Sequence, residues 1–153
     1  MSVIEMRFFS ECLNMFTNAN IILPLPRDAK AKIDALPVLY LLHGMGDDAT
    51  AWLRKTSVER YALSRGTAVI MPDGALSCYE NMAHGARYRD YICRELPKLM
   101  QENFPLSTQR EKNYIAGFDC FFDAAFYSLF KVSAVFCACY HACQVKADNA
   151  FAF

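Results

Sequence analysis

The stretch PVLYLLHGMG, residues Pro37–Gly46, is the strongest indication of the fold class of this chain. Its first six residues, 37–42, form a continuous apolar run, which is typical of a β-strand buried on both faces. Two similar short runs follow at 67–71 and 113–116. Because helical patterns lie between them, we expect the three runs to be adjacent parallel strands in the core of one sheet.

The residues before this stretch predict an antiparallel start to the same sheet. Segments 3–9 and 13–23 are rich in strand-forming residues, and the second ends at Pro24. The sequence therefore predicts an α/β domain with a mainly parallel sheet and antiparallel N-terminal strands.

Two helices are expected between the parallel strands. The tetrapeptide Thr56–Glu59 has the spacing of a capping box, and Gly66 stands where a C-terminal cap belongs. Apolar residues at helical spacing mark a second, longer helix over 87–102. Pro97 lies inside it and is expected to bend it, because proline lacks a backbone donor.

Candidate functional residues follow the ends of the predicted parallel strands. These ends carry His43–Gly46, Pro72–Gly74 and Gly117–Asp119. In open α/β sheets, ligands bind beyond the carboxyl ends of the strands. We therefore expect the functional site at this edge.

Composition excludes several function classes. The 153 residues carry 16 Lys+Arg and 16 Asp+Glu, and this balance is not that of a nucleic-acid binder. The first residues lack the apolar core of a signal peptide, and the apolar stretch 132–145 is shorter than the about 20 residues of a membrane span. Seven cysteines without paired CxxC spacing indicate reduced thiols, so we expect a cytoplasmic protein that binds neither nucleic acid nor membrane.

The cysteine-rich end of the chain does not predict a metal site. Cys137, Cys139, His141 and Cys143 are not arranged at a standard zinc spacing, and apolar residues flank them. We interpret these cysteines as buried thiols. No metal and no organic cofactor are expected.

The character of the sequence changes near residue 118. All six Gly and all six Pro precede this point, while residues 119–153 are mostly apolar. We therefore divide the chain into a domain part, 1–118, and a divergent apolar tail, 119–153, that completes or distorts the same domain. In the tail, a helix is expected up to about residue 131 and one more strand, beside 113–116, over 132–139.

Three stretches together resemble the esterase D-like branch of the α/β-hydrolases, which includes tributyrin esterases and S-formylglutathione hydrolases. They are 37–52 (PVLYLLHGMGDDATAW), 69–74 (VIMPDG), and 87–97 with 113–117. The resemblance covers about residues 3–117. It implies a partial α/β-hydrolase fold and cofactor-free hydrolysis of short acyl esters or thioesters by Ser-His-Asp chemistry.

The resemblance also implies roles for individual residues. Asp119 occupies the position of the nucleophilic Ser in the elbow G-x-S-x-G-G. The backbone N–H groups of Met45 and Cys120 would form the oxyanion hole. The substrate pocket would involve four residues: His43, beside the oxyanion turn that it shapes, and Tyr79, Asn81 and His84.

The sequence departs from the family pattern at the elbow and beyond it. Asp119 replaces Ser, Phe121 and Phe122 replace two glycines, and the two later strands that carry the triad Asp and His are not present in this sequence. Three readings stay open: a catalytically impaired ester hydrolase, a non-catalytic remnant or binding protein, and a hydrolase that uses Asp119 as its nucleophile. With the later strands missing, an uncovered sheet edge is expected to favour self-association.

Overall fold

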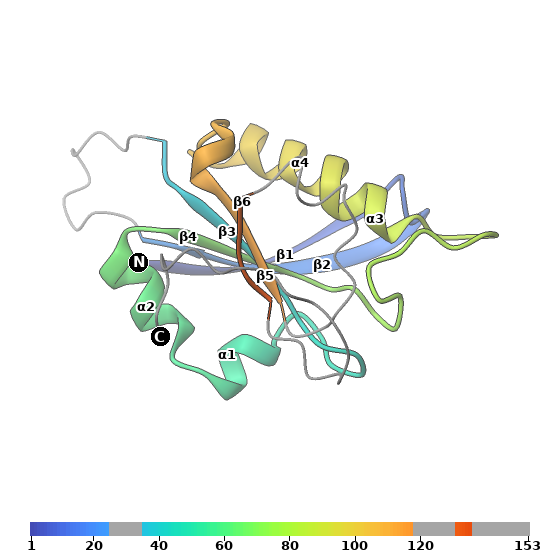
Figure 1. The fold of residues 1–153 in the computed structure, drawn as a ribbon, viewed down its shortest axis with the longest axis horizontal. Helices are drawn as coiled ribbons and strands as arrows, with labels where there is room; N and C mark the ends of the chain where they lie inside the picture. The colour runs from blue at the N-terminus through green and yellow to red at the C-terminus, as the bar shows by residue number, and fades with distance from the viewer. Residues whose placement is uncertain (25–34, 118–130, 136–153) are drawn as a thin grey trace.

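A computed structural model describes residues 1–24 and 35–117, and the strand backbone of 131–135. These residues form a six-stranded sheet in the order β1-β2-β4-β3-β5-β6. Helices cover both faces of the sheet (Figure 1). This is the expected mixed α/β architecture.

The first two strands are antiparallel, as predicted. β1 (Ser2–Ser10) pairs with β2 (Met15–Leu23) along its whole length, and β2 then pairs antiparallel with β4. The residues between β1 and β2 form a tight connection in which Asn14 has a positive φ of 54°, a conformation that Asn adopts more readily than most residues.

The three apolar runs form the parallel centre of the sheet. β3 (Val38–Leu42) lies between β4 (Ala68–Pro72) and β5 (Asn113–Gly117) and is parallel to both. All five residues of β4 are buried, which explains why this strand is continuously apolar rather than alternating. The prediction of three adjacent parallel strands is confirmed.

One further strand lies outside β5. β6 (Lys131–Val135) pairs parallel with β5, and the register shifts between Ile115 and Ala116. This confirms the additional strand expected in the tail as far as residue 135. The helix expected from residue 119 and the remainder of the tail lie outside the described residues, so the division at residue 118 stays a prediction.

The helices form two layers. α1 (Ala51–Lys55) and α2 (Val58–Arg65) lie on one face, and α3 (Tyr88–Asp90), η1 (Tyr91–Glu95) and α4 (Leu96–Asn103) follow each other on the opposite face (Figure 1). A short 3₁₀ turn, η2 (Arg110–Lys112), precedes β5. In the described parts of the chain, no helix is long and apolar enough to cross a membrane.

Each face of the sheet has its own apolar core. The larger core joins the sheet to the long helix, whose fully buried residues are Tyr91, Ile92, Leu96 and Met100. The smaller core joins Val58 and Ala62 of α2 to the other face. The helical spacing in the sequence therefore identified the buried face of the long helix correctly, because that spacing places its apolar residues on one side.

The two ends of α2 differ in how well the sequence predicted them. Gly66 ends the helix in the left-handed conformation, with φ 60°, as expected for a glycine cap. The predicted capping box is wrong: the helix begins at Val58, and Ser57 makes no side-chain capping bond. Thr56 Oγ1 instead accepts a hydrogen bond from the Val58 N–H at 3.2 Å.

The long helix widens immediately before Pro97. η1 is a π-helical turn in which the Leu96 N–H donates to the Tyr91 carbonyl, five residues back. Pro97 has no N–H to donate to the carbonyl four residues before it. At the place where the sequence predicted a bend, the structure therefore has a π-helical turn in place of the regular α-helical hydrogen-bond pattern.

Candidate active site

The carboxyl ends of β3 and β5 meet at the edge where the site was expected. Leu42, the last residue of β3, pairs with Gly117, the last residue of β5. A Cβ atom on Gly117 would lie 2.9 Å from Leu42 Cβ and 3.1 Å from the Leu42 carbonyl oxygen. The two strands therefore need glycine at this position, and the segments that follow them start side by side.

His43 is a buried connector between β3 and the loop after β4. Its side chain is 2% exposed. Nδ1 donates to the Gly44 carbonyl at 2.8 Å, and Nε2 accepts the Gly74 N–H at 2.8 Å. Because a carbonyl only accepts and an N–H only donates, the ring is the neutral tautomer protonated at Nδ1. Both ring nitrogens are thus engaged, which leaves His43 without a free nitrogen to act as a general base.

The carboxylate of Asp73 lies next to the same imidazole. Asp73 Oδ1 is 3.6 Å from His43 Nε2. Burial lowers the pKa of His43, but the side chain of Asp73 and the carbonyl of Gly44 raise it by more. The pKa of Asp73 is lowered, mainly by its interaction with His43. Protonation of Nε2 would break the hydrogen bond from the Gly74 N–H, and Asp73, which precedes Gly74 in the same loop, would then be the acceptor for Nε2.

Tyr79 fixes the backbone of His43. Its hydroxyl donates to the His43 carbonyl at 2.8 Å, and its ring covers Gly74 so closely that a Cβ there would lie 2.2 Å from Tyr79 Cε1. Ala75, Cys78 and Tyr79 all have positive φ angles. Such angles are costly for residues other than glycine, and here they turn the chain back toward β3.

The turn after His43 presents Met45 at the surface. The Asp47 N–H donates to the Gly44 carbonyl at 3.2 Å, and Gly46 has φ 83°. The Met45 side chain is 63% exposed. This is the turn that would carry one oxyanion donor; that role of Met45 stays a prediction.

Two carboxylates beyond the turn bind residues at the start of α1 and within it. Asp48 accepts the Thr50 N–H at 2.8 Å, immediately before α1. Asp47 pairs with Arg54 and Lys55, and the bond from Lys55 is the main reason that its pKa falls to about 2. The aspartates therefore anchor α1 and do not form an acid–base pair.

Trp52 ties α1 to the end of β3. Its Nε1–H donates to the Leu42 carbonyl at 3.0 Å. It is half-buried against the smaller core, so it anchors α1 to the sheet. The same contact positions the strand end from which the His43 turn begins.

The other two expected pocket residues lie farther along the same connection between β4 and α3. Asn81 forms a β-bridge with Arg87, and its Oδ1 accepts the Asp90 N–H at 3.2 Å at the start of the long helix. His84 is exposed within this loop, which projects from the body of the molecule between β4 and α3 (Figure 1). Their part in substrate binding stays a prediction, as do the roles of Asp119 and Cys120, which lie outside the described residues.

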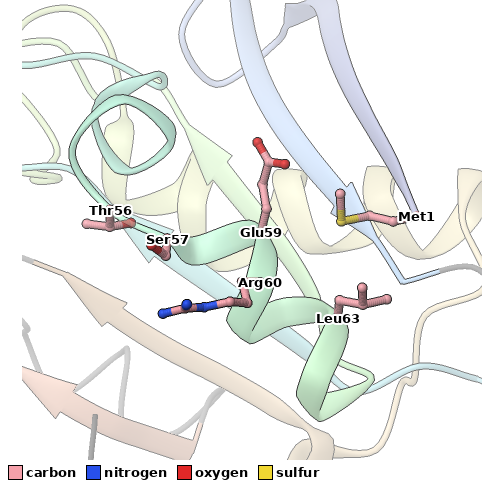
Figure 2. Close-up of a pocket in the computed structure, with 6 residues that line it drawn as sticks. All are labelled: Met1, Thr56, Ser57, Glu59, Arg60 and Leu63. Carbon is pink, nitrogen blue, oxygen red and sulfur yellow. The ribbon is translucent and has the colours of Figure 1, made fainter.

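A surface hollow lies elsewhere, along α2. Its six lining residues are Met1, Thr56, Ser57, Glu59, Arg60 and Leu63 (Figure 2). None of the expected site residues is among them. Within the ranges that the structure describes, no group of three or more His, Cys, Asp or Glu side chains is placed to hold a metal ion; the four Cys and His residues considered above lie outside those ranges.

Sequence reasoning missed two of the contacts that shape this edge. The ring of Tyr79 against Gly74 has no signature in the sequence, apart from the glycine itself in the PDG triplet. Glu95 also escaped notice: it accepts hydrogen bonds from Ser10 and from the backbone of Glu11 and Cys12. Nothing near Glu95 in the sequence indicates these partners, since they lie more than 80 residues away.

Comparison with known proteins places this architecture in a family. The family model described as "Putative esterase" matches residues 10–119. The acetyl esterase of Caldicellulosiruptor saccharolyticus is 28% identical over 123 residues, which cover 76% of this chain and 46% of that protein.

Solved structures give the same result. The fluorophosphonate-binding serine hydrolase FphF and the S-formylglutathione hydrolase FrmB, both from Staphylococcus aureus, are each 39% identical, with TM-scores of 0.71 and 0.68. Each match covers 76% of this chain and 46% of the other. The chain therefore spans about half the length of these relatives. The match of the family model over most of the chain, together with the mixed sheet and the His43 turn at the end of β3, shows that the chain belongs to this esterase family of the α/β-hydrolases.

Proposed function

We propose that this chain forms the oxyanion-binding part of an active site for short acyl esters or thioesters. We also propose that the chain does not itself hydrolyse these esters, because Asp119 stands in place of the nucleophilic Ser. The observation that supports the site is the pairing of Leu42 with Gly117. Because of this pairing, the Met45 turn and the segment that contains Asp119 begin at neighbouring strand ends. A substrate carbonyl would lie between them, with the Met45 and Cys120 N–H groups donating to its oxygen. A cytoplasmic location remains part of this proposal.

The chemistry of Asp119 is the reason to expect no turnover. In the family mechanism, a Ser hydroxyl attacks the acyl carbon, loses its proton to a base, and forms an acyl ester as the alcohol or thiol leaves. Attack by a carboxylate would instead give a mixed anhydride. Hydrolysis by water would need a general base, and His43 has both nitrogens bonded.

A second candidate activity rests on the same residue. A carboxylate nucleophile operates in hydrolases that attack a saturated carbon and form an ester intermediate. Asp119 stands in the nucleophile position of the sequence. We keep this activity as an alternative, since no described residue is placed as its base; an alkyl halide or an epoxide added to the assay below would detect it.

The test is hydrolysis of p-nitrophenyl acetate and of an acyl thioester by the purified 153-residue chain. We expect no turnover above a matched blank, and none in Asp119→Ser, because the substitution adds a hydroxyl without a base. An oxyanion hole alone leaves about 10³–10⁴-fold catalysis over water in enzymes that have lost their triad, so the assay must detect rates of that size.

Two variants separate the alternatives. Turnover that disappears in Asp119→Ala would overturn the proposal and assign the reaction to the carboxylate. Turnover that survives Asp119→Ala but disappears in Cys120→Ala would assign it to the thiol. Glu102→Ala on α4 is the matched control, since this exposed residue has no part in the proposed site and should leave any measured rate unchanged.

A further inference from the structure

The outer strand β1 has an unusual combination of length and exposed side chains. Among the described strands it pairs only with β2, and none of them pairs with its other edge. It is nine residues long, and its exposed side chains are Val3, Glu5, Arg7 and Phe9. An open edge of this length presents unpaired backbone donors and acceptors that favour pairing with another strand.

The exposed residues of β1 complement a second copy of the same strand. If two β1 strands pair antiparallel about a two-fold axis at Met6, Glu5 of one copy faces Arg7 of the other, and Arg7 faces Glu5. The same symmetry places Val3 opposite Phe9 at both ends. Opposite charges and apolar pairs directly across an antiparallel ladder are both favourable. The order apolar, acid, base, apolar is therefore self-complementary in this one register.

The inner face of β1 is complementary in the same register. It carries Ile4, Met6 and Phe8, which pack against the larger core. Ile4 and Met6 are only partly buried in the single chain. Pairing would place Ile4 opposite Phe8 of the second copy, and Met6 opposite Met6. The partner strand would therefore remove further apolar surface from water on this face.

Aromatic contacts hold the outer face in position for such a partner. Phe9 and Phe16 are edge-to-face, with ring centroids 5.4 Å apart, and both are at least half exposed. The guanidinium of Arg7 lies over the Phe16 ring, 5.5 Å from its centroid. Val3 of a second copy would pack beside this exposed cluster, and Glu5 of that copy would face the guanidinium.

We propose that β1 is a self-association surface, and that two copies of this chain pair antiparallel through it, with Glu5 of each copy opposite Arg7 of the other. The two sheets then join into one continuous sheet. This edge lies on the opposite side of the sheet from β5 and β6. The proposal does not depend on any catalytic activity.

Charge reversal tests the proposal, with self-association measured by sedimentation over a series of protein concentrations. The wild-type chain should form dimers. Glu5→Lys and Arg7→Glu should each raise the dimer dissociation constant about tenfold or more, because each places like charges opposite each other twice. The double variant E5K/R7E should restore the dimer, and an equal mixture of the two single variants should form a mixed dimer.

Controls are available on α4, where Lys98 and Glu102 form an exposed i,i+4 pair. Glu102→Lys and Lys98→Glu change the net charge by the same amounts as the β1 variants, and they should leave the dissociation constant unchanged. A monomer at all concentrations would overturn the proposal. So would self-association that Glu5→Lys leaves unchanged, or a double variant as weak as the single ones.

Discussion

The Glu95 carboxylate closes the turn between the first two strands: Ser10 Oγ donates to Glu95 Oε2 at 2.6 Å, although the residues are 85 positions apart. The same carboxylate accepts the N–H groups of Glu11 at 2.7 Å and Cys12 at 3.1 Å. Ser10 Oγ in turn accepts the Leu13 N–H at 3.1 Å. One side chain of the π-helical turn therefore satisfies most of the donors at the end of β1.

Replacing Glu95 tests how much this contact contributes to stability. Glu95→Gln removes the charge and converts one acceptor into a donor, so at least one of the three donors loses its partner. We expect the free energy of unfolding to fall by about 1–3 kcal/mol, measured by urea denaturation at pH 7. Glu102→Gln on the exposed side of α4 is the matched control and should change stability by less than about 0.5 kcal/mol. An equal loss in both variants would contradict the assignment.

The same carboxylate predicts a pH dependence. Burial raises the pKa of Glu95, but the hydrogen bonds from Ser10, Glu11 and Cys12 lower it by more, and the net direction is downward. A carboxyl group whose pKa is lower in the folded state stabilises the fold above its unfolded pKa, and this stabilisation is lost as the pH falls through the folded pKa. The difference in unfolding free energy between wild type and Glu95→Gln should therefore be constant near neutrality and shrink below about pH 4.3. A difference that grows on acidification would contradict this prediction.

The cysteine beside this carboxylate should react slowly. The pKa of Cys12 is raised to about 11, mainly by burial and further by the neighbouring Glu95. Because the thiolate is the reactive form, Cys12 alkylation by iodoacetamide at pH 8 should be slow in wild type and faster in Glu95→Gln. Peptide mass spectrometry measures this site separately from the other cysteines. Equal rates in the two proteins would show that Glu95 does not influence the thiol.

Gly74 should not tolerate a side chain. In Gly74→Ala the new Cβ would meet the Tyr79 ring at 2.2 Å, so the ring must move and its hydroxyl must leave the His43 carbonyl. We expect a loss of about 1–3 kcal/mol of unfolding free energy. The double variant Gly74→Ala/Tyr79→Ala should lose less than the sum of the single variants, because removing the ring also removes the clash. Strict additivity would contradict the contact.

Gly117 has a different neighbour and should respond differently. A Cβ at this position would approach the Leu42 carbonyl oxygen at 3.1 Å as well as Leu42 Cβ. Backbone on a central strand cannot move aside as a side chain can, so Gly117→Ala should cost about 1–3 kcal/mol. Truncating Leu42 to Ala keeps its Cβ and should not rescue the variant. A stability equal to wild type would show that β3 and β5 can separate without cost.

Local patterns in the sequence were enough to predict the central sheet, because continuous apolar runs of four to six residues are stable only where both faces are covered. They also predicted the buried face of the long helix and the glycine cap at Gly66, since both depend on local spacing and local backbone freedom. The family resemblance carried by residues 37–52 is confirmed for the same reason: it rests on short, contiguous segments.

The contacts of individual side chains at the edge of the sheet could be found only in the folded structure. Tyr79 contacts Gly74 and the His43 carbonyl because three positive φ angles reverse the chain between them, and composition does not encode that path. Glu95 reaches the β1–β2 turn because the long helix crosses the sheet beside it. The tautomer of His43 is set by its hydrogen bonds to Gly44 and Gly74, which follow the ends of two different strands. Hydrogen bonds between residues distant in sequence depend on the packing of whole elements, so a local pattern cannot specify them.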